Sequence, residues 1–283
     1  MKQEKIDLHV HSSLSDGTDS PESLVRHAKE KGLCAIALTD HDSVAGVQRA
    51  QCEGKIQGVE VVPGVELSAY DGRELHILGY GIQTAHPALT EFLQRMHESR
   101  LDRVHAIVRK LSGNGFSISW EEVQELAEQM VSRVHVAQVL VKKGYVSTLA
   151  EAFEHFIGEG KPYFEPRKYI SPQETIHTIH QAGGVAVLAH PYLLHCDETL
   201  KQLLEQLPEV DGIECHYPRH SQAQYELYCN IARERGLLET GGSDYHGKNR
   251  PESCLGEGCM KQNIPFELLQ KLKQRLKNMD EMK

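Results

Sequence analysis

Residues 7–17 read Asp-Leu-His-Val-His-Ser-Ser-Leu-Ser-Asp-Gly, and this stretch combines a strand pattern with the chemistry of a metal ligand set. Apolar and polar residues alternate over residues 5–11, which is typical of a strand. Because alternate residues of a strand point to the same side, His9 and His11 present two imidazoles together. With the nearby carboxylate of Asp16 they could begin a metal site, although a solvated pair of histidines at a strand end would have the same pattern.

The composition describes an ordinary globular protein with many histidines. The 283 residues carry a formal net charge of −9, 17 histidines and seven cysteines. This length suits one large domain or one domain with an insertion. The acidic balance argues against stable binding of duplex nucleic acid, and no apolar run is long enough for a membrane span. The cysteines are odd in number, form no Cys-x-x-Cys pair and follow no signal peptide, so we expect reduced thiols and a cytoplasmic location.

Strand and helix patterns alternate at both ends of the chain. The first part predicts strands at 5–11, 33–39, 59–65 and 74–80, with helices at 21–31 and from 43 to about 53. The last part predicts strands at 184–189, 211–215 and 237–241, with helices at 171–182, 198–206, 221–235 and 265–277. About seven strands, most followed by helices, predict an α/β fold with a closed parallel barrel.

The middle of the chain has a different pattern. Between about Pro87 and Phe156, apolar residues repeat at helical spacing and no strand pattern is convincing. We therefore expect residues 85–165 to form a helical insertion domain that caps the substrate. Residues 1–84 and 166–283 would then form the barrel.

The candidate metal ligands follow the predicted strands. His76, within its short strand, fits this pattern least well. The candidates at or just after a predicted strand end are His9, His11, His41, Glu66, His190, Asp244 and His246. In a parallel barrel the carboxyl ends of the strands open on one face, where active sites lie. Histidines scattered without a common role would not track strand ends, so this placement predicts a polynuclear metal site.

Six short motifs occur in order along the chain. They are Asp-Leu-His-Val-His-Ser (7–12), Thr-Asp-His-Asp (39–42), Gly-Val-Glu (64–66), Leu-His-Ile-Leu-Gly-Tyr (75–80), Ala-His-Pro (189–191) and Gly-Ser-Asp-Tyr-His-Gly (242–247). Together they resemble the motifs of the PHP (polymerase and histidinol phosphatase) family. The resemblance implies a distorted (β/α)7 barrel and three divalent metal ions. Nine positions match the family's ligands: His9, His11, Asp16, His41, Glu66, His76, His190, Asp244 and His246.

The resemblance also implies how the ions would be shared. One would bind His9, His11, Glu66 and Asp244, a second Glu66, His76 and His190, and a third Asp16, His41 and His246. Imidazole and carboxylate ligands suit Mn, Zn or Fe, and we expect Mn, with Zn or Fe as alternatives. Two ions that share Glu66 could hold a bridging hydroxide, and a third could bind a phosphate oxygen. The expected activity is therefore metal-dependent hydrolysis of a phosphoric ester.

Two further segments point to one branch of the family. Residues 132–137 resemble its Gly-Arg-Pro-His segment, with differences at Ser132 and Val134, and residues 217–221 resemble its Tyr-Pro-Arg-His-Ser segment. The helical insertion is similar to the same branch, which includes 3′,5′-nucleotide bisphosphate phosphatases and 5′-to-3′ exoribonucleases. The resemblance implies conversion of a nucleotide 3′,5′-bisphosphate to the 5′-nucleotide and phosphate, with short 5′-phosphorylated RNA as a further substrate.

Cationic residues near these segments are candidates for binding substrate phosphate, because guanidinium groups pair with phosphate oxygens. The expected substrate-binding residues are Arg133, His135, Arg167, Lys168 and Arg219. Arg219 and His220 are the expected catalytic residues, and His220 could protonate a leaving oxygen.

Each of these residues has a simpler explanation as well. Arg133 could cap its helix or form a salt bridge there. Arg167 and Lys168 could be solvated surface charges. His216, at a predicted strand end, could support the site or serve only in packing.

Three alternative functions remain at this point. Histidinol-phosphate phosphatases belong to the same superfamily, and the metal site does not distinguish them. Amidohydrolases also place His-x-His on a first barrel strand, but we see no bridging lysine at a strand end. A non-catalytic PHP structural or interaction module would be expected to have lost ligands. The expected partner is a small nucleotide phosphate or a short oligonucleotide, not a membrane.

Overall fold

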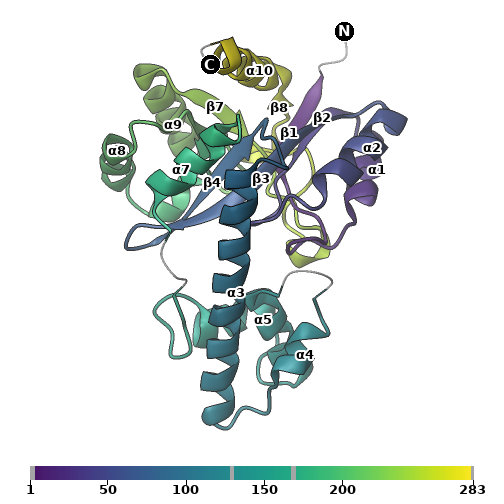
Figure 1. Cartoon of the computed structure of the whole chain (residues 1–283), viewed down its shortest axis with the longest axis vertical. Helices are drawn as coiled ribbons and strands as arrows, with labels where there is room; N and C mark the ends of the chain where they lie inside the picture. Colours follow the sequence, from purple (N-terminus) through teal and green to yellow (C-terminus); the bar gives the residue numbers. More distant parts are fainter. Residues whose placement is uncertain (1–3, 128–130, 167–169, 282–283) are drawn as a thin grey trace. The chain divides into compact units, whose positions relative to one another are not determined.

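The structure is a computed structural model that describes residues 4–127, 131–166 and 170–281. The chain divides into two compact units (Figure 1). One consists of Met1–Glu91 and Tyr169–Lys283, and the other of Phe92–Lys168. The expected domain boundaries at 85 and 165, and the substrate-capping role, stay predictions.

A single sheet forms the centre of the first unit. Within the described residues it has eight strands in the order β7-β6-β5-β4-β3-β2-β1-β8. Their bounds are β1 (Lys5–Val10), β2 (Leu33–Leu38), β3 (Glu60–Tyr70), β4 (Glu74–Tyr80), β5 (Val185–Leu188), β6 (Gly212–His216), β7 (Leu238–Gly241) and β8 (Ile264–Pro265). A bridge from Val10 to Tyr245 brings β1 beside the segment that follows β7, so the sheet nearly closes into a barrel. The predicted α/β barrel is confirmed.

The expectation of a wholly parallel barrel is wrong, because β4 runs antiparallel to both β3 and β5. Only residues 71–73 join β3 to β4, and a parallel strand would need a much longer crossover connection. The pairing with β4 also extends β3 to Tyr70. Glu66, which we expected at a strand end, therefore lies within β3.

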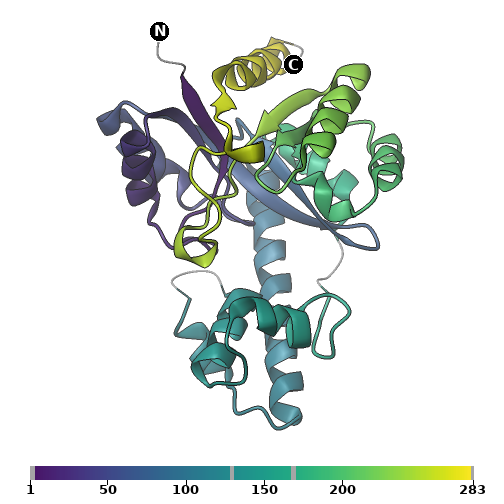
Figure 2. The ribbon, with the colours of Figure 1, turned by 180° about the vertical axis from the view of Figure 1, so that it is seen from behind.

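Helices of the first unit flank the barrel on both sides. Figures 1 and 2 show α1 (Pro21–Glu30) and α2 (Val47–Gln57) together on one side, and α7 (Pro172–Gln181), α8 (Asp197–Gln206) and α9 (Gln222–Arg235) on the other. The start expected for α2 at Ser43 is wrong, because residues 43–46 are not helical and α2 begins at Val47. Its end is set by Gly58, whose φ of 68° suits a glycine at a helix C-terminus.

Apolar side chains close the end of the barrel at which the parallel strands begin. Ile6 and Val185 lie in one buried cluster with Leu268 and Leu272 of α10 (Phe266–Glu281). Because β4 runs in the opposite direction, its last residue, Tyr80, belongs to the same cluster. The opposite end of the barrel is therefore the end available for polar chemistry.

The second unit has its own apolar core. Its helices are α3 (Pro87–Gly113, from Phe92 onward), α4 (Trp120–Gln124), α5 (Arg133–Lys142), α6 (Leu149–Ala152) and the π-helix η1 (Phe153–Ile157). Val104, Leu111, Leu140 and Ile157 are among its buried residues. No helix among the described residues of either unit combines the length and apolar character that crossing a membrane requires.

Asp7 joins β1 to two segments far away in the sequence. Its carboxylate is fully buried and accepts hydrogen bonds from the backbone N–H of His9 (3.2 Å), Ser243 (2.9 Å) and Gly256 (2.7 Å). It also accepts one from the Ser243 hydroxyl. These bonds hold the ends of β1 and β7 in place.

We expect Asp7→Ala to lower the free energy of unfolding by about 3 kcal/mol or more, because it leaves buried N–H groups without acceptors. Urea unfolding followed by circular dichroism measures the change. The matched control is Asp71→Ala, which removes an exposed carboxylate in the turn between β3 and β4 and should change stability by less than about 0.5 kcal/mol. Equal losses in the two variants would contradict the role of Asp7.

Candidate metal centre

Nine polar side chains meet at the barrel end opposite α10. They come from six different strands or the segments that follow them, and most are buried. They are the nine residues predicted from the sequence: His9, His11, Asp16, His41, Glu66, His76, His190, Asp244 and His246. The structure thus brings the whole predicted set together, while the role of each residue as a metal ligand stays a prediction.

The direction of β4 explains why His76 did not fit the pattern of strand ends. Because β4 is antiparallel to β3, its first residues lie at the end of the barrel where the parallel strands finish. His76 pairs in register with Ser68, and its Nδ1 atom lies 2.8 Å from Glu66 Oε1. His76 therefore reaches the cluster from near the start of its strand.

Glu66 lies at the centre of the cluster. Its Oε1 atom is 2.8 Å from His76 Nδ1 and 2.9 Å from His190 Nε2. Its Oε2 atom is 3.2 Å from one nitrogen of each of three imidazoles, those of His9, His11 and His41. Burial alone would raise the pKa of Glu66, but the neighbouring His41 and His76 hold it well below its usual value. Glu66 is therefore a buried carboxylate in the middle of imidazoles.

One group of donors surrounds a point between His9 and His11. Their Nε2 atoms are 3.1 Å apart, and both lie 3.2 Å from Glu66 Oε2. Asp244 Oδ1 is 3.5 Å from His9 Nε2 and 3.2 Å from His11 Nε2. Four ligands placed 2.0–2.1 Å from one ion in a tetrahedron are about 3.4 Å apart. The spacing of this group matches that arrangement.

The other oxygen of Asp244 is held away from this group. Its Oδ2 atom accepts a hydrogen bond from the Tyr217 hydroxyl (2.8 Å) and is paired with the Arg250 guanidinium. Burial alone would raise the pKa of Asp244, but Arg250 and His246 hold it well below its usual value. Asp244 is thus an ionised carboxylate whose Oδ1 atom faces the histidines.

A second group of donors lies around Asp16. Its Oδ1 atom is 3.1 Å from His246 Nε2 and 3.7 Å from His11 Nδ1, and its Oδ2 atom is 3.8 Å from His41 Nε2. Among the described residues, His11 Nδ1, His41 Nδ1 and His246 Nε2 are buried atoms that make no hydrogen bond. Each of these nitrogens nevertheless lies near a carboxylate oxygen, and a cation between the nitrogen and the oxygen would satisfy both.

A third group consists of His41, Glu66 and His76, whose donor atoms also lie close together. It differs from the set that the family resemblance implies, in which His190 accompanies Glu66 and His76. His190 Nε2 is nevertheless within 3.3 Å of His76 Nδ1. Imidazole nitrogens with carboxylate oxygens suit divalent transition-metal ions, so the residues fit the cofactor that the resemblance implies.

The backbone is strained at two of the candidate ligands. His190 has a φ of 27° and Asp244 a φ of 51°, in a region that residues other than glycine rarely adopt. Such positions cost of order 1–3 kcal/mol each and persist where the surroundings impose them. Here hydrogen bonds from His190 N to Glu214 Oε2 (2.8 Å) and from Asp244 N to the His9 carbonyl (2.9 Å) hold the strained residues.

Two carboxylates that we did not predict orient the cluster. Glu214, fully buried on β6, accepts from His9 Nδ1 at 2.9 Å, so that His9 Nε2 is left for the cluster. Asp40 accepts from Ser12 N at 2.6 Å and from the Ser15 hydroxyl at 2.7 Å, which fixes the loop before Asp16. An acidic residue inside an apolar strand was the signal that could have identified Glu214.

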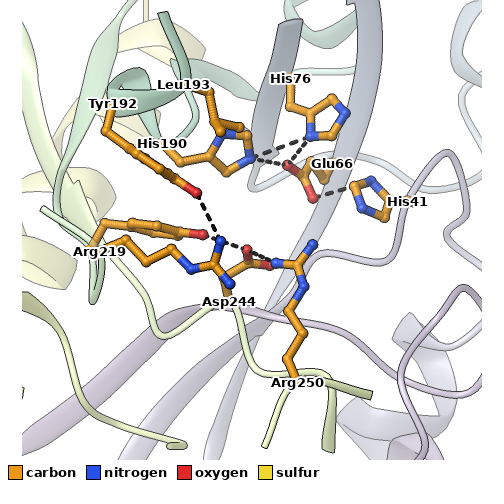
Figure 3. Close-up of a pocket in the computed structure, with 10 residues that line it drawn as sticks. His41, Glu66, His76, His190, Tyr192, Leu193, Arg219, Asp244 and Arg250 are labelled. Carbon is orange, nitrogen blue, oxygen red and sulfur yellow. Dashed lines mark hydrogen bonds and ion pairs between the residues drawn. The ribbon is translucent and has the colours of Figure 1, made fainter. Parts of the chain in front are cut away.

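A pocket of about 190 Å³ opens over the cluster (Figure 3). Figure 3 shows His41, Glu66, His76 and His190 along one side of it, with Asp244, Arg219 and Arg250 along the other. Tyr192, Leu193 and Tyr217 complete the lining. The sequence reasoning missed Arg250, Tyr192 and Leu193, although Arg250 comes only four residues after His246.

The two expected catalytic residues differ in their access to this pocket. Arg219 lines it and donates to the Tyr192 hydroxyl (3.3 Å) and to Glu252 (2.6 Å). His220 is buried, is not part of the pocket lining, and has its Nδ1 atom 2.7 Å from the Cys215 carbonyl oxygen. Burial lowers the pKa of His220 to about 4. Its role as a general acid stays a prediction, which these observations weigh against.

Two of the other expected substrate-binding residues lie in the described part of the second unit. His135 Nδ1 accepts from the backbone N–H of Ser132 at 2.9 Å and caps α5. The Arg133 guanidinium lies 5.5 Å from the centre of the Phe153 ring. Arg167 and Lys168 lie outside the described residues. The substrate-binding roles of all four residues stay predictions.

Several known proteins are similar to this chain in sequence or in structure. The family described as PHP domain matches residues 7–170 of the chain. A "5'-3' exoribonuclease" of Haemophilus influenzae is 36% identical over 248 residues, covering 86% of this chain and 90% of that protein. A "3',5'-nucleoside bisphosphate phosphatase" of Chromobacterium violaceum is 33% identical, and the match covers 85% of this chain and 87% of that protein.

A further relative carries another activity in its name. A "phosphoribosyl 1,2-cyclic phosphate 1,2-diphosphodiesterase" of Eggerthella lenta is 34% identical, covering 86% of this chain and 94% of that protein. Among solved structures, a protein of Bifidobacterium adolescentis, provisionally named a metal-dependent phosphoesterase, superposes with a TM-score of 0.86 at 30% identity. The match covers 96% of each chain.

We expect Glu214→Gln to weaken Mn²⁺ binding by about 10- to 100-fold, because it removes the charge that orients His9 while keeping the size of the side chain. Isothermal titration calorimetry of the metal-free protein measures the affinity. Glu226→Gln, at an exposed position of α9, is the matched control and should bind Mn²⁺ as the unaltered protein does. Unchanged affinity in Glu214→Gln would show that the carboxylate does not support the cluster.

Proposed function

Because the chain belongs to the PHP domain family and is a metal-dependent phosphoesterase, we propose that it hydrolyses nucleotide 3′,5′-bisphosphates to the 5′-nucleotide and phosphate. The observation that carries the proposal is the pocket itself. One side of it is the imidazole and carboxylate cluster, and the other side carries two guanidinium groups. A substrate with two phosphates can engage both sides at once.

We further propose that the cluster holds three divalent ions, with Mn²⁺ as the first candidate and Zn²⁺ or Fe²⁺ as alternatives. The ligand sets would be His9, His11, Glu66 and Asp244; Glu66, His76 and His190; and Asp16, His41 and His246. When bound, such ions lower the pKa of a coordinated water and offset the charge of phosphate oxygens. The carboxylates of Asp16, Glu66 and Asp244 favour cations at this place, since neighbouring histidines, and Arg250 beside Asp244, hold the pKa of each well below its usual value.

Arg219 is the residue that we assign to the second phosphate. Its side chain is half exposed at the pocket, and its bonds to Tyr192 and Glu252 aim the guanidinium without burying it. Arg250 differs, because its guanidinium is already paired with Asp244 and positions that carboxylate. A guanidinium binds two phosphate oxygens at once, which also orients the ester.

The aromatic and apolar lining suits the nucleoside part of the substrate. The rings of Tyr192 and Tyr217 stack with centroids 5.4 Å apart. Leu193 beside them is 47% exposed and adds an apolar side chain to the pocket lining. A nucleobase has an apolar face that such a surface can contact.

Two other features of the proposal concern substrate range and location. The exoribonuclease relative, at 36% identity, makes short 5′-phosphorylated RNA the second candidate substrate.

The cytoplasm is the proposed location. All seven cysteines, each within the described residues, are free thiols, and thiols persist in reducing compartments.

The proposal predicts that the Mn²⁺-loaded protein removes the 3′-phosphate of adenosine 3′,5′-bisphosphate and leaves 5′-AMP. Phosphate release and product chromatography measure this, with AMP, histidinol phosphate, a phosphoribosyl 1,2-cyclic phosphate and a short 5′-phosphorylated RNA assayed in parallel. Glu66→Ala, prepared in the same way, should show no turnover and so excludes a contaminating phosphatase. Hydrolysis of histidinol phosphate or the cyclic phosphate, with the bisphosphate intact, would refute the proposed substrate.

Arg219→Ala should raise the Michaelis constant for the bisphosphate by at least about tenfold, because a charge-assisted bond to phosphate contributes more than 1.4 kcal/mol. Steady-state kinetics measure it, and Arg219→Lys should recover part of the loss. Arg235→Ala, at an exposed position of α9, is the control for losing a surface arginine. If Arg219→Ala and Arg235→Ala have the same Michaelis constant, Arg219 does not bind the second phosphate.

A further inference from the structure

We propose that the first unit carries another cation site, of the kind that binds Zn²⁺ through a thiolate, formed by His216, Cys229 and Glu239. The three residues come from β6, α9 and β7. One donor atom of each lies within 4.8 Å of the donor atoms of the other two. None of the three is among the nine residues of the metal centre.

The topology explains why these residues meet. β6 and β7 are parallel neighbours, and α9 packs against both. Because Glu214 points into the metal centre, its neighbour Cys215 points the other way, toward α9. The register of β6 shifts between Glu214 and His216, which is how a bulge turns a side chain to the other face. The His216 ring accordingly lies edge-on to Tyr225 of α9, with ring centroids 4.7 Å apart.

Cys229 is the centre of the proposed site. It is 7% exposed, while His216 and Glu239 are partly exposed, so an ion could enter from the side of these two residues. The groups that influence the pKa of Cys229 are the Cys215 thiol, the Tyr225 hydroxyl and the Glu239 carboxylate, so polar groups neighbour the sulfur. A sulfur surrounded by polar groups in this way differs from a cysteine that merely fills apolar space.

The protonation of the ligands also suits a metal ion. The hydrogen bond with Cys215 lowers the pKa of the Cys229 thiol. Burial lowers the pKa of His216 to about 4, so its imidazole is neutral near pH 7. A thiolate and a neutral imidazole are the forms that bind metal, and any proton on Cys229 would be released on binding.

The donor set selects the class of ion. One sulfur, one nitrogen and one carboxylate oxygen favour Zn²⁺ over Mn²⁺, Mg²⁺ or Ca²⁺, because thiolates prefer softer ions. Three protein ligands leave the fourth position of a tetrahedron for water. The metal centre of the barrel has no sulfur among its nine predicted ligands, so the two sites would prefer different ions and give different spectra.

Co²⁺ titration of the reduced, metal-free full-length protein tests the proposal. A cobalt ion bound by a thiolate absorbs in the near ultraviolet through sulfur-to-metal charge transfer, whereas imidazole and carboxylate ligands do not give this band. We expect one such band, whose final intensity corresponds to one thiolate-bound Co²⁺ per chain in addition to any Co²⁺ in the metal centre, and which disappears on addition of Zn²⁺. A titration without the band would overturn the proposal.

Variants then assign the band to these residues. Cys229→Ser should abolish it, and Glu239→Gln, which keeps the shape of a partly exposed side chain, should weaken Co²⁺ binding by at least about tenfold. Cys52→Ser, at an exposed cysteine of α2, is the control and should leave the band unchanged. Circular dichroism shows whether each variant folds. A band that survives in folded Cys229→Ser, or normal affinity in folded Glu239→Gln, would refute the site.

Discussion

The buried carboxylate of Glu66 imposes the main physical constraint on this barrel. It has no exposure to solvent, and five imidazoles lie within 3.2 Å of its two oxygens. An uncompensated charge in such a place costs several kcal/mol, and protonated histidines packed so closely would repel one another. Divalent cations between the side chains would satisfy the carboxylates and the neutral imidazoles together. The cluster is therefore best understood as a site built to hold metal ions.

This constraint requires the two ends of the barrel to differ in chemistry. At one end α10 and the first residues of the parallel strands form an apolar cluster that excludes water. At the other end, Asp7, Asp40 and Glu214 accept hydrogen bonds that fix the segments carrying the cluster. The strain at His190 and Asp244 is tolerated because these bonds, and the core behind them, hold the backbone. Stability and site geometry thus depend on the same buried polar groups.

The metal cluster and the side chains opposite it form two chemically different parts of the pocket. Relatives that share the family differ in the substrates that their names give: an RNA, a nucleoside bisphosphate and a cyclic phosphate. A common metal centre can serve all of these, because each reaction is hydrolysis of a phosphoric ester. The residues around the centre, here Arg219, Tyr192 and Leu193, are the ones that we propose for this selection. These residues differ from the cluster in being partly exposed.

The sequence by itself determined the α/β barrel and the identity of the nine clustered residues, because strand periodicity and ordered motifs are local properties of the chain. It could not determine that β4 runs antiparallel, that β3 continues past Glu66, or that Glu214 and Arg250 reach the cluster. Those features depend on contacts between residues far apart in sequence, such as Glu214 with His9 and Arg250 with Asp244. The meeting of His216, Cys229 and Glu239 is of the same kind, since a register shift in β6 and the packing of α9 decide it. Tertiary structure decides such pairs because side-chain direction follows strand direction and register, which no single segment encodes.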